Sequence, residues 1–73
     1  MNERYYFVYE GPVFSFGKII QNKWVYRTKA ETISKALNNL AWNYKRINQL
    51  NDNFKIELDQ KYLIAKGKEK NNG

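Results

Sequence analysis

The side chains that could do chemistry in this sequence gather around Trp42. At about 100° per residue, Trp42 falls opposite Ile33 on an expected helix. The residues that share its face are basic or carry amides, namely Lys35, Asn38, Asn39, Lys45, Arg46 and Gln49. An aromatic ring among cations can stack on a base while the cations bind phosphates. Trp and Arg are also enriched at protein interfaces. A third interpretation is structural, with the 11–21 loop or a symmetry mate covering Trp42.

A second group of aromatic and basic side chains falls in the expected sheet. Its members are Tyr5 or Tyr6, Trp24, Tyr26, Arg27 and Lys29. Aromatic residues exposed on a sheet can stack single-stranded bases in RNA-binding modules. Half-buried cross-strand pairs that support the sheet are the structural alternative. For this group we favour the structural interpretation.

The composition argues against catalysis and against a metal or cofactor site. There is no His and no Cys among the 73 residues, which excludes a His base, a Cys nucleophile and His or thiolate metal ligands. The acids Asp52, Glu57 and Asp59 lie close in sequence, but their spacing fits no calcium loop. The Gly11–Lys18 stretch matches no phosphate-binding loop and is interpreted as structural. We therefore expect no catalytic residue, no metal, no cofactor and no small-molecule substrate.

The charge balance favours polyanionic partners. The net charge is +6, and the terminal residues Lys66, Lys68 and Lys70 against Glu69 contribute +2 of it, which leaves +4 for the rest. No apolar run approaches the roughly 20 residues that span a bilayer. The first residues carry no basic leader followed by a hydrophobic segment, so we expect a cytoplasmic protein without a membrane partner.

A helix over 32–50 must position the Trp42 face. Its apolar residues recur with helical spacing on the opposite side, at Ile33, Ala36, Leu37, Leu40, Ala41, Tyr44 and Ile47. Thr32 is the expected N-cap, since its hydroxyl can accept from a free amide of the first turn.

Strands are expected on both sides of this helix. Residues 4–10 and 24–30 predict strands, and Gly11-Pro12 is expected to end the first. Residues 13–20 are either a short extended segment or an ordered loop, with a turn near Gln21-Asn22. The strict alternation of residues 54–58 predicts another strand, and residues 62–65 a short last one.

The sequence therefore predicts an α+β fold in two layers. We expect an antiparallel sheet of three to four strands with one helix on one face, in a ββαβ-like order. Residues 1–65 are predicted to form a single domain, and residues 66–73 a disordered basic tail.

Two stretches resemble a family of small proteins of phages and prophages of low-GC Gram-positive bacteria. The first contains Tyr9-Glu10-Gly11-Pro12-Val13-Phe14 and Phe16-Gly17-Lys18. The second contains Trp24, Lys35-Ala36 and Asn39-Leu40-Ala41-Trp42-Asn43-Tyr44-Lys45-Arg46. The resemblance covers roughly residues 5 to 60 and implies a phage-encoded accessory protein, but it assigns no site residues. At the level of topology, the chain is also similar to a small ribosomal-protein domain, which implies that such a core can lie on RNA.

Two functional hypotheses follow. The first is an interaction module that binds a protein partner or itself, with Trp42 as anchor and Lys35, Lys45 and Arg46 around it. The alternative is a small basic nucleic-acid-binding protein that uses Arg27, Lys29, Lys35, Lys45 and Arg46 on phosphates.

Overall fold

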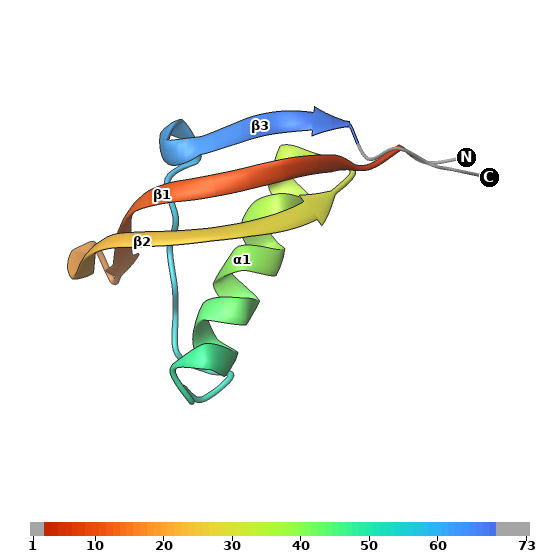
Figure 1. The fold of residues 1–73 in the computed structure, drawn as a ribbon. Helices are drawn as coiled ribbons and strands as arrows, with labels where there is room; N and C mark the ends of the chain where they lie inside the picture. Colours follow the sequence, from red (N-terminus) through yellow and green to blue (C-terminus); the bar gives the residue numbers. More distant parts are fainter. Residues whose placement is uncertain (1–2, 69–73) are drawn as a thin grey trace.

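The computed structural model describes residues 3–68 and shows a three-stranded antiparallel sheet with one helix on one face (Figure 1). The strands are β1 (Tyr5–Ser15), β2 (Lys18–Ala30) and β3 (Leu63–Lys68), and the helix is α1 (Ile33–Ile47). A single 3₁₀ turn, η1 (Gln60–Tyr62), precedes β3. The strands lie in the order β2-β1-β3, so β1 is central. This confirms the predicted α+β class.

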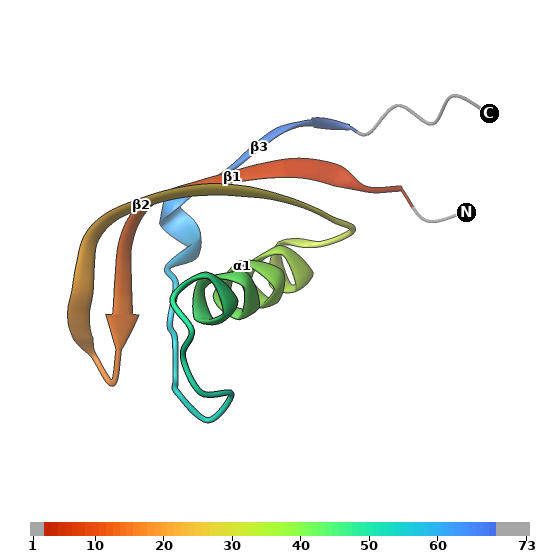
Figure 2. The ribbon, with the colours of Figure 1, turned by 60° about the horizontal axis from the view of Figure 1, so that its bottom comes forward.

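The β1–β2 hairpin is longer than predicted and turns at a different place. β1 continues through Gly11-Pro12 to Ser15, and the chain reverses at Phe16-Gly17 instead of near Gln21-Asn22. Phe16 and Gly17 have positive φ angles of +51° and +79°. Positive φ at both residues is typical of the two-residue turns whose twist matches that of the flanking strands. Two register shifts between Gly11 and Phe14 place extra residues in β2, and the hairpin bends there (Figure 2).

Pro12 is tolerated inside β1 because its nitrogen does not face β2. The backbone N–H and C=O of Phe14 bond Glu57 at 3.0 and 2.8 Å, on the side away from β2. Alternate residues of a strand point the same way, so Pro12 also faces that side. Pairing with β3 ends at Tyr9, so no ladder bond is lost at Pro12.

The strand predicted over 54–58 is wrong. This stretch is extended, but it contacts β1 through one isolated bridge between Phe14 and Glu57. β3 already occupies the β1 edge from Tyr5 to Tyr9, and beyond it β1 bends, so no straight edge remains for a full ladder. β3 continues to Lys68, so residues 66–68 of the predicted tail belong to the sheet, and Gly67 and Lys68 pair with β1. Residues 69–73 lie outside the described residues.

The core forms where α1 crosses the concave face of the sheet. One buried cluster joins Tyr9, Val13 and Trp24 to Leu40 and Tyr44 of α1. A smaller one, at the start of the helix, contains Phe7, Ala30 and Ala36. The predicted apolar stripe packs inward at its centre, whereas Ile33 and Ile47 at its two ends are about half exposed, because the sheet covers only the middle turns. The predicted N-cap is confirmed, since the Thr32 hydroxyl accepts from the Lys35 amide at 3.1 Å.

Gly11 has a packing role that its place beside proline conceals in the sequence. It lies within β1 and is buried, and a Cβ atom built on it would overlap the ring of Tyr62. The absence of a side chain at Gly11 therefore lets η1 close against the sheet.

We expect Gly11→Ala to lower the free energy of unfolding by about 1–3 kcal/mol, since overpacking forces the Tyr62 ring to move. Urea unfolding followed by far-ultraviolet circular dichroism measures this change. In a Tyr62→Gly background, which removes both the ring and the Cβ atom that the new methyl group would overlap, the same substitution should cost much less. An equal cost in both backgrounds would contradict the proposed overlap.

Burial also raises the pKa of two core tyrosines, Tyr9 and Tyr44, above their ordinary value of 10.0. A raised pKa means that the folded state holds the phenol proton more tightly than the unfolded chain does. The contribution of these two protonated phenols to stability is complete below about pH 10 and is lost as the pH rises further, at up to about 1.4 kcal/mol per pH unit for each group.

We expect Tyr44→Phe to be less stable at neutral pH and to lose stability less steeply as the pH rises. Urea unfolding from pH 8 to 11 tests this, and parallel curves for the two proteins would refute it.

Candidate functional site

Trp42 lies on the outer face of α1, away from the sheet. It is 53% exposed, and the Arg46 guanidinium carbon lies 4.8 Å from its ring centre. The 11–21 stretch packs elsewhere, since Gln21 accepts a hydrogen bond from the Tyr44 hydroxyl at 2.8 Å and Phe14 pairs with Glu57. The interpretation that the 11–21 loop covers Trp42 is therefore wrong. The Trp42 face, defined here as Lys35, Asn38, Asn39, Trp42, Lys45 and Arg46, is open along the helix.

The lysines of the Trp42 face are already bonded within the chain. The Lys35 ammonium pairs with Glu31 at 2.6 Å, one helical turn earlier. The Lys45 ammonium donates to the Asp52 carbonyl at 3.2 Å. The exposed Lys35–Glu31 ion pair contributes little to stability, but it offsets one positive charge. The bond of Lys45 to a neutral carbonyl leaves the charge of Lys45 in place. The face therefore combines an aromatic ring and amides with the positive charges of Lys45 and Arg46.

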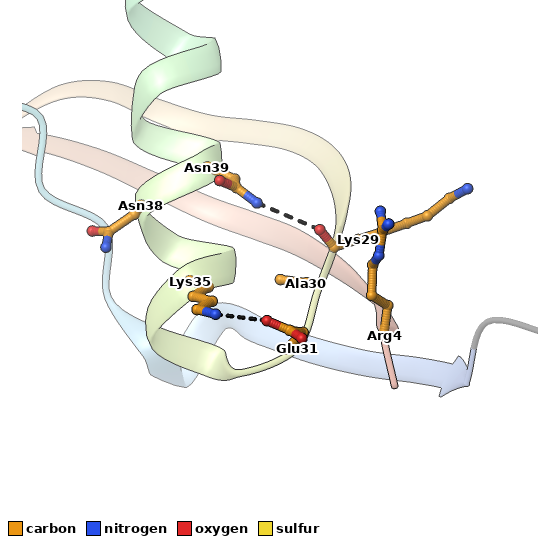
Figure 3. A pocket seen from close by; sticks show the side chains of 7 residues that line it. All are labelled: Arg4, Lys29, Ala30, Glu31, Lys35, Asn38 and Asn39. Carbon is orange, nitrogen blue, oxygen red and sulfur yellow. Dashed lines mark hydrogen bonds and ion pairs between the residues drawn. The ribbon is translucent and has the colours of Figure 1, made fainter. Parts of the chain in front are cut away.

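A shallow groove opens between the N-terminal half of α1 and the end of β2 (Figure 3). It is lined by Arg4, Lys29, Ala30, Glu31, Lys35, Asn38 and Asn39. Asn39 donates to the Lys29 carbonyl at 3.4 Å, which ties the helix to the strand. The side chains of Arg4 and Lys29 point away from α1, so the cations do not converge on one point in the groove.

Four of the predicted site residues thus meet in this groove, together with two charged residues that were not predicted. Lys29, Lys35, Asn38 and Asn39 were candidates, and Arg4 and Glu31 were not. Glu31 could have been found as the i, i+4 partner of Lys35. Arg4 could not, because its position beside the end of β2 depends on the Tyr5–Ala30 register of the hairpin.

The predicted aromatic set of the sheet is divided between two faces. Trp24 and Tyr26 stack at 5.1 Å, and Trp24 meets the Tyr44 ring edge-on at 4.9 Å, so both lie on the helix side. Tyr6, Arg27 and Lys29 lie on the open side, where the Lys29 ammonium is 5.4 Å from the Tyr6 ring centre. The structural interpretation holds for Trp24, while Arg27 is separate from the Trp42 face.

The acidic residues near the sheet end have structural partners. Glu57 accepts from the Gly17 amide at 3.1 Å, and Asp59 accepts from the Lys61 amide at 3.0 Å as the cap of η1. Within residues 3–68 no group of three or more His, Cys, Asp or Glu side chains is placed to hold a metal. No helix in that part of the chain is long and apolar enough to cross a membrane.

The sequence matches no protein-family model, no curated protein and no solved structure. The resemblance to small phage proteins therefore stays a prediction.

Proposed function

We propose that this protein is a non-enzymatic interaction module that binds a protein partner, or a second copy of itself, through the Trp42 face. The observation that carries the proposal is the 53% exposure of a tryptophan on a helix whose other side forms the core. Burying an indole stabilises a fold, and a chain this short has few other side chains to bury. Leaving Trp42 half exposed therefore sacrifices stability of the isolated chain. A phage-encoded protein acting in the cytoplasm of a bacterial host fits this role and stays a prediction.

The geometry around Trp42 suits a protein surface. Arg46 lies over one part of the indole, so the two side chains present a rigid, flat and partly polar patch. Trp and Arg are the residue types most often found at interface hot spots. Lys35 and Lys45 have acceptors within the chain, so a partner does not need to be strongly acidic.

We expect Trp42→Ala to weaken association about 30-fold or more while leaving the fold intact. Light scattering measures self-association, and affinity capture with the purified protein as bait measures binding to a partner. Ile47→Ala is a matched control, because Ile47 lies on the same helix with the same 53% exposure but on a different face. Equal losses in the two variants, or no loss with Trp42→Ala, would overturn the proposal.

Nucleic-acid binding is the second candidate, and the position of two cations favours it. Arg4 and Lys29 project outward beside the groove, and Arg27 lies two residues along β2. Phosphate binding by these groups would release counterions and weaken steeply with salt.

An electrophoretic mobility assay with single- and double-stranded DNA and RNA tests this second candidate. If several phosphates are contacted, affinity should fall roughly ten- to a thousandfold between low and physiological salt. Lys29→Glu should abolish the shift, whereas Lys61→Glu, which makes the same change in net charge on η1, should not. The absence of any shift at low salt would exclude this function.

A further inference from the structure

The outer edge of β2 is unpaired in the part of the chain that the structure describes. In the order β2-β1-β3, β2 is an outer strand, and Figure 1 shows it at one border of the sheet. An exposed strand edge presents a row of backbone N–H and C=O groups to which another strand can bond.

The register identifies which backbone groups point outward. Phe14 bonds Glu57 on the side away from β2, and the extra residues of the two register shifts lie in β2, so the alternation of β1 is uninterrupted. Odd-numbered residues of β1 therefore bond β2, and their partners include Trp24, Tyr26 and Thr28. The backbone groups of Val25 and Arg27, which lie between these partners, point away from the sheet.

Side-chain amides cover the two ends of this edge. Gln21 donates to the Lys23 carbonyl at 3.0 Å, and Asn39 of α1 donates to the Lys29 carbonyl at 3.4 Å. Both carbonyls belong to odd-numbered residues, which agrees with the direction deduced from the register. The open part of the edge is therefore short and centres on Val25 and Arg27.

The side chains along this edge are basic. β2 contains Lys18, Lys23, Arg27 and Lys29 and no acidic residue. Val25, which is 55% exposed, shares the open face of the sheet with Arg27 and Lys29. Lys23 pairs with Glu10 of β1 at 3.0 Å, so an acidic side chain on an added strand is favoured more beside Arg27 than beside Lys23.

A second copy of the chain fits this edge poorly. Two antiparallel β2 edges centred on Tyr26 would place Lys29 opposite Lys23 of the second copy, twice. Shifting the register places Arg27 opposite Arg27 or opposite Lys23. Like charges directly opposite each other destabilise a strand pair.

We propose that the β2 edge binds an extended acidic segment of a partner protein as a fourth, antiparallel strand. Backbone groups of Val25 and Arg27 exchange hydrogen bonds with the added strand. Alternate side chains of that strand then lie beside an apolar position at Val25 and beside basic positions at Arg27 and Lys29. The segment therefore carries an apolar residue preceded at two and four positions by acids. This surface is distinct from the Trp42 face, and the inference does not depend on the function proposed for that face.

In the test, the full chain is titrated at physiological salt with the peptide Thr-Glu-Thr-Glu-Thr-Val-Thr, acetylated and amidated at its ends. Binding is measured from the changes in backbone amide NMR chemical shifts. We expect the largest shifts at the Val25 and Arg27 amides. Methylating the Val nitrogen of the peptide, which faces β2, should weaken binding about tenfold, because a backbone bond is lost. Methylating the nitrogen of the preceding Thr, which faces away, should change it by less than about twofold.

Charge reversal gives the second arm of the test. Arg27→Glu should weaken binding of the acidic peptide about tenfold and improve binding of the peptide in which both Glu are replaced by Lys. Trp42→Ala should change neither affinity, which separates this surface from the Trp42 face. Equal effects of the two methylated peptides would reduce the interaction to charge attraction, and no binding of the acidic peptide would exclude the proposal.

Discussion

The buried hydroxyl of Tyr9 joins parts of the chain that are far apart in sequence. Tyr9 is fully buried in the central strand, where its hydroxyl donates to the Pro12 carbonyl at 2.6 Å and accepts from the Asp59 amide at 3.2 Å. Its ring lies between those of Trp24 and Tyr62, with centroids 6.2 and 6.3 Å away. A buried phenol without partners would cost about 1–3 kcal/mol, so the bend of β1 and the start of η1 must both form for Tyr9 to be accommodated.

The bend of the hairpin follows from this constraint. The bent end of the hairpin encloses the core on a third side, in addition to the sheet and α1 (Figure 2). Beyond Gly11 the hairpin turns beside the layer that holds α1, and Glu57 fastens its tip by accepting from the Gly17 amide (Figure 2). The turn itself is strained, because Phe16 is a bulky residue at φ +51° and remains 75% exposed. Packing of the bend, and not the turn residues alone, therefore holds the two strands in this register.

The features that could be predicted from the sequence are those decided within a few residues. The helix, its Thr32 cap and the outward position of Trp42 follow from periodicity and cap chemistry. The prediction that Gly11-Pro12 ends the first strand rests on the fact that both residues disfavour a regular ladder, and it is wrong. In the structure, Pro12 lies in the part of β1 that β3 does not reach, and Gly11 leaves room for Tyr62.

The errors about the site and the last strands have the same origin in contacts between distant residues. The alternation of residues 54–58 is typical of a strand, but β3 pairs with the straight part of the β1 edge. Arg4 joins the groove through hairpin register, which no local pattern encodes. The pairing of Lys35 with Glu31, by contrast, is local, and it offsets one of the three positive charges on the Trp42 face. The positive charge of the chain is then expressed more strongly along β2, which has four basic residues and no acid. The aromatic helix face and the charged strand edge thus suit chemically different ligands, so occupation of one does not require the other.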